Sequence, residues 1–222
     1  MIVCLVTDRR RLGEAMAARG EDWIDALEEQ VTAAARAGAD LIQVREPDLG
    51  ARDLATLVRT LLRATEGTSA RIVVNDRVDV ALATKAAGAH LKEASFSPDE
   101  VRRIAPPGFI IGCSVHGPAG AAARRSADYL IAGTVQPTVS KRPADYLDWE
   151  GLKAVVAAAH GTPVLGIGGL DVRSIPVLAG SCAAGLAAVG AFIPPAGQQL
   201  RPWVHKRVED MRFAFDSTRP GR

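Results

Sequence analysis

The feature that most constrains the fold of this chain is a repeated alternation of short apolar runs with longer alanine-rich stretches. Most of the runs are apolar at consecutive positions, which is typical of strands buried on both faces of a parallel sheet. The stretches between them have the length and charge decoration of surface helices. The pattern predicts eight strands, at Ile2–Val6, Leu41–Arg45, Arg71–Val74, Ala89–Leu91, Ile110–Ser114, Tyr129–Ala132, Val164–Ile167 and Gly185–Val189.

Helix-boundary residues support this division. The segment Ser97–Glu100 has the form of a capping box, and Gly38, Gly88 and Gly161 each follow a stretch as a helix-ending glycine would. The predicted helices are Trp23–Ala37, Ala51–Ala64, Val78–Ala86, Pro98–Ile104, Pro118–Arg125, Trp149–Ala159, Val172–Ala179 and an amphipathic last helix, Leu200–Phe215.

Eight strand–helix units in 222 residues predict an α/β protein with a single-domain (β/α)8, or TIM, barrel. The rival architecture is a doubly wound open sheet, which usually has fewer strands. We expect the barrel and its C-terminal helix to span residues 1–215 and residues 216–222 to form a frayed tail.

Charge and cysteine usage exclude several classes of protein. The formal net charge is only +2, so no global field favours nucleic acid or an anionic membrane, and no run approaches the ~20 apolar residues of a membrane helix. Cys4, Cys113 and Cys182 form neither a disulfide framework nor a zinc motif. We therefore expect a cytoplasmic protein whose partner is a small molecule.

Every predicted strand ends in small or polar residues, and barrel enzymes bind substrate where the strands end. Gly168, Gly169, Val189 and Gly190 follow the last two strands, where bare backbone can approach a phosphate. The alternative is that these glycines only form tight turns. The loop 133–147 adds the hydroxyl groups and cation of Thr138, Ser140 and Lys141, unless it is an ordinary surface loop.

Other strand-end side chains suggest proton transfer and anion binding. His116 and Ser114 follow the fifth strand, and a histidine at such a position suits acid/base chemistry. Gln43 and Arg45 lie on the same side of the second strand and could bind an anion together. Asp76 is a single carboxylate, which is few protein ligands for magnesium. The residues predict a phosphate-binding barrel enzyme with a histidine acid/base, and they leave its substrate open.

The same residues, in the same order, resemble the thiamine phosphate synthase/TenI superfamily, whose fold is a (β/α)8 barrel. Each matching block is weak alone, and the ordered set is specific. The blocks are Val6–Asp8, Gln43–Glu46, Val74–Leu82, Gly88–Leu91, Ile111–His116, Ala127–Tyr129, Gly133–Lys141 and Gly166–Gly169.

The superfamily implies two activities. The synthase joins an aminopyrimidine pyrophosphate to a thiazole phosphate with magnesium, and the resemblance implies that Asp76 would bind the metal, with Asn75, Arg45 and Lys141 on the pyrophosphate. The chain departs from that pattern twice. Pro47 stands where the synthase motif has a lysine, and Ser95 stands where a second metal-binding aspartate is expected.

These departures favour the other activity, a TenI-like thiazole tautomerase, which needs no metal. His116 would then relay a proton within a thiazole carboxylate phosphate, helped by Ser114, while Gln43, Arg45 and Asn75 position the ring. A third hypothesis is a non-catalytic regulatory barrel of the thiamin pathway. All three imply a phosphorylated thiazole ligand, and the family resemblance also suggests a homo-oligomer.

Overall fold

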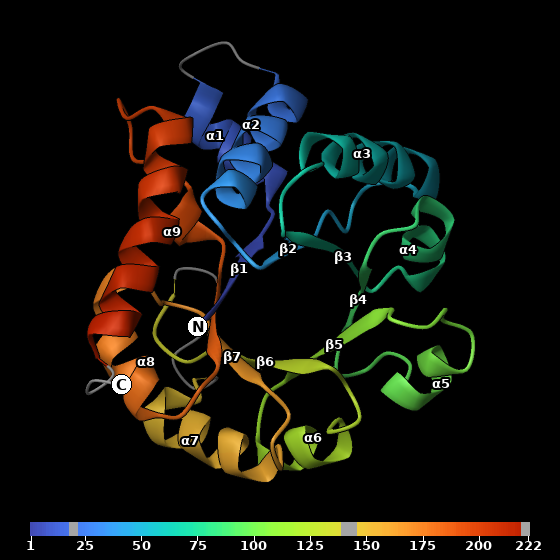
Figure 1. Cartoon of the computed structure of the whole chain (residues 1–222), viewed down its shortest axis with the longest axis vertical. Coiled ribbons are helices and arrows are strands. Elements are labelled where there is room, and N and C mark those ends of the chain that lie inside the picture. Colours follow the sequence, from blue (N-terminus) through green and yellow to red (C-terminus); the bar gives the residue numbers. More distant parts are fainter. Residues whose placement is uncertain (18–21, 139–145, 219–222) are drawn as a thin grey trace.

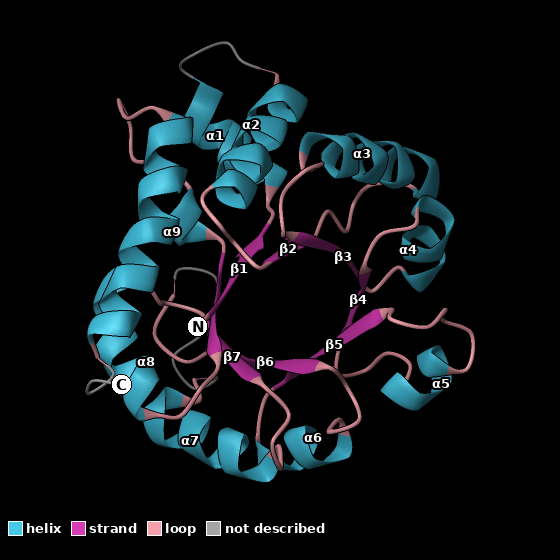
Figure 2. Cartoon of the chain, in the orientation of Figure 1, coloured by secondary structure: helices cyan, strands magenta, loops and turns pink. Residues whose placement is uncertain are grey.

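Eight parallel strands close into a barrel in the computed structural model, which describes residues 1–17, 22–138 and 146–218. Figure 2 shows the ring of strands enclosed by helices. Each strand pairs with its neighbours in the sequence, and β1 pairs with β8 to complete the ring. The single-domain TIM barrel is therefore confirmed, and the open sheet is excluded. The strands are β1 (Ile2–Val6), β2 (Leu41–Val44), β3 (Arg71–Asn75), β4 (Gly88–Leu91), β5 (Ile110–Val115), β6 (Tyr129–Gly133), β7 (Val164–Ile167) and β8 (Gly185–Ala188).

The helices surround the ring in chain order (Figure 1). They are α1 (Arg9–Met16), α2 (Trp23–Arg36), α3 (Ala51–Ala64), α4 (Val78–Thr84), α5 (Pro98–Arg102), α6 (Pro118–Ala123), α7 (Asp148–Ala158), α8 (Ile175–Gly180) and α9 (Leu200–Ser217), with short 3-10 turns η3 (Val172–Ser174) and η4 (Gly190–Phe192).

Two predicted details were wrong. Helix α1 was not predicted, although the Asp8 side chain caps it and Leu12 and Met16 bury one face of it. Gly88 does not end a helix: it opens β4, where an added Cβ would collide with the carbonyl of Ile110. Lys85, in a left-handed conformation, ends α4 in its place. A glycine therefore marks close strand packing here rather than a helix end.

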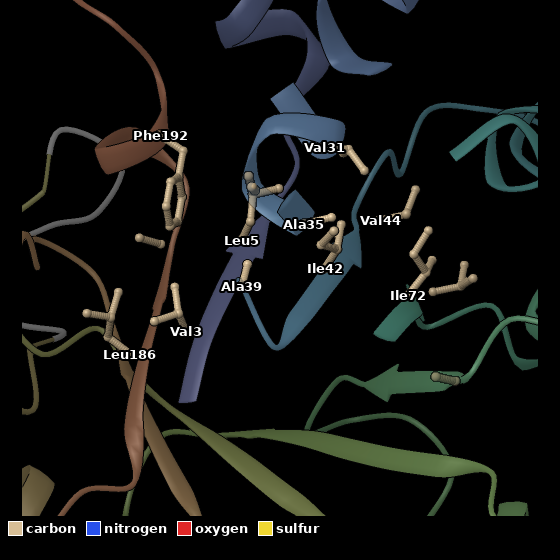
Figure 3. Close-up of a cluster of buried hydrophobic side chains, with 14 of the residues drawn as sticks. Val3, Leu5, Val31, Ala35, Ala39, Ile42, Val44, Ile72, Leu186 and Phe192 are labelled. Carbon is tan, nitrogen blue, oxygen red and sulfur yellow. The ribbon is translucent and has the colours of Figure 1, made fainter. Parts of the chain in front are cut away.

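Two apolar cores hold the barrel together. Alternate strand residues such as Leu5 and Ile42 point outward and belong to one cluster with Val31 and Ala35 of α2, as Figure 3 shows. The intervening residues point inward and fill the barrel. The inner core consists of Cys4, Val6, Leu41, Val73, Tyr129, Ile131, Leu165 and Ala187.

The inward positions become polar toward the carboxyl ends of the strands. Gln43 follows Leu41 and Asn75 follows Val73 on the inward side of their strands, and Ser114 follows Gly112 in the same way. Gly112 makes room for the ring of Tyr129, since a Cβ there would lie 2.1 Å from that ring. Strand alternation thus places a set of polar side chains at one mouth of the barrel.

Helix α9 packs along α2 and also contacts α8 and the turns η3 and η4. Its Val204, Val208 and Met211 are buried, and Arg212 donates hydrogen bonds to the carbonyl of Gly38 and to Asp40. The helix continues to Ser217, two residues beyond residue 215, where we expected it to end. Within the described residues, no helix is long and apolar enough to span a membrane.

Candidate active site

Two adjoining cavities lie at the carboxyl ends of the strands. The larger has a volume of about 1000 Å³ and the smaller about 430 Å³. Arg45, Ser114 and His116 line both, so these three side chains form part of a shared wall. The structure therefore brings together strand-end residues from opposite sides of the barrel in one continuous site.

The larger cavity contains the glycines predicted to hold a phosphate. Gly168 and Gly169 have φ angles of 98° and 66°, and a Cβ on either would collide with the segment 134–137. Backbone conformation and packing thus account for both glycines. Gly190 differs, because the heavy atom closest to an added Cβ there is Nη2 of Arg11, at 3.3 Å. The open backbone of Gly190 therefore faces a guanidinium group.

Arg11 is a candidate anion-binding residue that the sequence analysis missed. It lies on α1 and lines the larger cavity with Val189 and Gly190. A guanidinium group beside a bare turn suits a phosphate, because it presents several N–H donors in a planar fork.

We expect Arg11→Ala to weaken phosphate binding about 10-fold, the effect of losing one charge-assisted hydrogen bond. Calorimetric titration with inorganic phosphate measures this loss. Arg59→Ala, which removes a charge from the exposed face of α3, is the control. Equal phosphate affinities in both variants would exclude Arg11 from the site.

Of the three residues after β6 that were predicted to bind a phosphate, the structure describes Thr138. Thr138 lines the larger cavity, and its backbone N–H donates to the hydroxyl of Tyr146 at 3.4 Å. Ser140 and Lys141 lie outside the described residues, so their predicted roles stay predictions.

The last helix also reaches the larger cavity, which the sequence analysis did not foresee. Trp203 and Arg207 line it, and the guanidinium of Arg207 stacks on the Trp203 ring at 3.9 Å. The indole N–H of Trp203 donates to the carbonyl of Ala191, within η4. The contacts of Trp203 therefore position the turn that begins at Gly190.

Gln43 and Asn75 form a pair at the smaller cavity. The Gln43 amide donates to Oδ1 of Asn75 at 2.9 Å, and both residues line the cavity with Arg45. Thr7 holds the chain that follows β2 in place. Its Oγ1 accepts a hydrogen bond from the Arg45 backbone N–H at 2.9 Å and donates one to the buried carboxylate of Glu46. The predicted substrate-positioning residues therefore lie together.

His90 is the clearest residue that the sequence analysis passed over. It faces inward from β4, with Nδ1 3.1 Å from the Tyr129 hydroxyl and Nε2 2.9 Å from Ser114 Oγ. Burial lowers the pKa of His90 to about 3, so the ring is neutral at neutral pH. A neutral imidazole donates at one nitrogen and accepts at the other, and His90 therefore orients the Ser114 hydroxyl.

His116 follows β5 and faces both cavities, on the shared wall. Its Nδ1 lies 2.5 Å from Oε2 of Glu93, and about half of its side chain is exposed. A carboxylate partner orients the imidazole, and an imidazole held at the cavity can accept or donate a proton there. Glu93 itself is held beside α6, where an added Cβ on Gly120 would meet its carboxylate.

Asp76 follows β3 and has both carboxylate oxygens engaged. Its Oδ2 lies 2.7 Å from Nζ of Lys92, and Ser95 donates a hydrogen bond to its Oδ1. Burial acts to raise the pKa of Asp76, but the hydrogen bonds from Lys92 and Ser95 outweigh it and the pKa lies below its ordinary value. Among the described residues, no group of three His, Cys, Asp or Glu side chains could hold a metal ion.

Comparison with known proteins gives a consistent set of matches. A family model described as thiamine monophosphate synthase matches residues 14–192. A thiamine-phosphate synthase of Roseiflexus castenholzii is 38% identical over 194 residues, covering 86% of this chain and 81% of that protein. One of Pyrococcus abyssi is 34% identical over 210 residues, covering 94% and 91%. The solved thiamine phosphate pyrophosphorylase from Pyrococcus furiosus aligns with a TM-score of 0.78 at 30% identity, covering 98% and 96%.

Proposed function

This chain belongs to the thiamine monophosphate synthase family, and we propose that it is a thiamine-phosphate synthase. In that reaction a thiazole nitrogen attacks the methylene carbon of an aminopyrimidine pyrophosphate. A C–N bond forms, the C–O bond breaks, and pyrophosphate leaves with the electron pair. From the sequence alone we expected the tautomerase first and the synthase second. The names of the relatives favour the synthase, so we reverse that order.

The observation that carries the proposal is the pair of cavities with a shared wall. A synthase must hold two anionic substrates side by side, whereas a tautomerase holds one. The larger cavity has the open backbone of Gly190 beside Arg11, and the smaller one has Lys92 and Asn75. Arg45 faces both, so each compartment can hold one anionic substrate.

The residues divide between the two substrates accordingly. Gly190, Arg11 and Thr138 would hold the thiazole phosphate, with Ser140 added from the loop, while the family resemblance assigns Lys141 to the pyrophosphate. Arg45 and Lys92 would bind the pyrophosphate and stabilise the charge that develops as it leaves. The side-chain amide groups of Gln43 and Asn75 would form hydrogen bonds with the pyrimidine and so orient it.

The magnesium that the family resemblance implies does not fit the residues present. Asp76 has both oxygens engaged, and Ser95 cannot supply a second carboxylate. Magnesium is usually bound by carboxylates together with substrate phosphates, and it needs open ligand positions. The pyrophosphate would therefore be held by the protein's own cations, Arg45 and Lys92.

The tautomerase stays a second candidate because of one observation. The Glu93–His116 pair faces the shared wall of the cavities, where an imidazole could move a proton on a bound thiazole ring. The synthase reaction assigns no proton transfer to this pair.

The synthase assay supplies the aminopyrimidine pyrophosphate and the thiazole phosphate and measures thiamin phosphate. We expect product, and we expect Arg45→Ala to lower kcat/KM about 30-fold, because a cation on the leaving group is lost. His116→Ala should stay within about 3-fold of the parent, since the reaction uses no imidazole at that place.

The control for His116→Ala is His205→Ala, because His205 also pairs with a glutamate, Glu209, on the exposed face of α9. No thiamin phosphate from the parent protein would refute the synthase. Conversion of a thiazole carboxylate phosphate that His116→Ala abolishes and His205→Ala does not would establish the second candidate instead.

The remaining expectations of location and assembly stay predictions. The cysteine usage predicts a cytoplasmic protein, and the family resemblance suggests a homo-oligomer. Cys4 and Cys113 are buried and free, and burial raises the pKa of both thiols.

A further inference from the structure

The loop after β4 carries a cation to the position where the family resemblance implies a metal. Lys92 is the first residue after β4, and its Nζ lies 2.7 Å from Oδ2 of Asp76. The Lys92 backbone N–H also approaches Oδ1 of the same carboxylate, at 3.4 Å. The side chain and the backbone N–H of Lys92 therefore each contact one of the two carboxylate oxygens of Asp76.

Ser95 completes the arrangement from the same loop. It donates a hydrogen bond to Oδ1 of Asp76. Arg124 anchors the loop, since its guanidinium donates to the carbonyl of Glu93 at 2.6 Å and to that of Phe96 at 2.7 Å. The Lys92 and Ser95 contacts to Asp76 are thus built into an ordered turn.

The other carboxylate of this loop is directed elsewhere. Glu93 pairs with His116 at 2.5 Å and packs against Gly120 of α6. It therefore does not join Asp76 as a second ligand. In the part of the chain that the structure describes, a divalent cation would find one carboxylate there, with an ammonium group already on it.

The local charge balance is nevertheless that of a metal site. A divalent cation between two carboxylates is neutral overall, and so is one ammonium group on one carboxylate. An ammonium group has three N–H donors, and the one that faces Asp76 leaves others for a ligand. Lys92 lines the smaller cavity beside Arg45 and Asn75, and 58% of its side chain is exposed.

We infer that the Lys92 ammonium group, held by Asp76, replaces a divalent cation in this chain and binds the pyrophosphate of the substrate directly. That the bound anion is the pyrophosphate of a substrate rests on the proposed synthase function. The cluster of Asp76, Lys92 and Ser95 is therefore a metal-free anion site at the mouth of the barrel.

Binding measurements on the intact chain test this inference. Pyrophosphate is titrated by calorimetry in EDTA, and Mn²⁺ is titrated separately by electron paramagnetic resonance. We expect the parent protein to bind pyrophosphate in EDTA and to show no Mn²⁺ binding that depends on Asp76. Lys92→Ala should weaken pyrophosphate binding at least 10-fold, and Lys92→Arg should retain it within about 3-fold.

Lys153→Ala is the matched control. Lys153 makes a similar ion pair with Glu150, at 2.8 Å with half of its side chain exposed, on α7. It lies outside the lining of both cavities, so pyrophosphate binding should not change. Because Lys92 is largely exposed, its replacement should leave the fold intact, which the melting temperature checks.

Two results would overturn the inference. The first is Mn²⁺ binding by the parent protein that Asp76→Asn abolishes. The second is pyrophosphate affinity in EDTA that is absent from the parent or unchanged in Lys92→Ala. Neither measurement depends on turnover. A protein that binds pyrophosphate through Lys92 and makes no thiamin phosphate would refute the proposed function alone.

Discussion

Replacing Gly190 by valine should abolish tight phosphate binding, with a loss of about 100-fold in affinity for the thiazole phosphate. The side chain would project toward Nη2 of Arg11, which lies 3.3 Å from the Cβ position, and would fill the space that a phosphate needs. Loss of two charge-assisted hydrogen bonds has this magnitude, at roughly 1.5 kcal/mol each. Calorimetric titration of the parent and the variant measures it.

Gly190 is a better test position than its neighbours across the cavity. Gly168 and Gly169 have positive φ angles and close contacts, so replacing either would disturb the backbone itself. Gly180→Val is a suitable control, because no heavy atom lies within 4 Å of its Cβ position at the end of α8. Unchanged phosphate affinity in Gly190→Val, with the fold intact, would place the phosphate elsewhere.

The buried His90 should make the protein lose stability as the pH falls from about 6.5 toward 3. Burial lowers the pKa of the folded histidine to about 3, while the unfolded chain keeps the ordinary value of about 6.5. Between these values only the unfolded chain takes up the proton. His90 therefore lowers the free energy of unfolding by up to about 1.4 kcal/mol for each unit that the pH falls in this range. Above pH 6.5 the histidine is neutral in both states, and this loss of stability is absent.

Denaturant unfolding of the parent and of His90→Gln at pH 7 and pH 4.5 measures this difference. Glutamine keeps an amide between Tyr129 and Ser114 but takes up no proton, so the variant should lose about 2 kcal/mol less than the parent over this range. His205→Gln, on the exposed face of α9, is the control. Equal losses in the parent and His90→Gln would contradict the assignment.

The barrel could be predicted from the sequence because each strand is a short apolar run followed by a helical stretch. Helix α1 was missed because the run of arginines after Asp8 hides its pattern. The signal was nevertheless present, since Leu12 and Met16 have helical spacing and Asp8 precedes them. Local patterns therefore predict elements well when apolar residues dominate them.

The site was only partly predictable. Strand ends indicate Gln43, Asn75 and Ser114, and the same alternation would have found His90, which pairs with Asn75 in the strand register. The pairing of Lys92 with Asp76 depends on how two loops meet, which no local pattern encodes. The resemblance indicated the missing carboxylate at Ser95, and only the structure places an ammonium group on the remaining one.

The pairing of β1 with β8 has a consequence for how the chain is made. A ribosome releases β1 first, and 178 residues separate its last residue, Val6, from the first residue of β8, Gly185. At ~5–20 residues per second, one edge of β1 waits roughly 10–40 s for its partner during translation. Until then the nascent sheet has an open edge that can pair with other chains, so chaperone protection matters most in that interval.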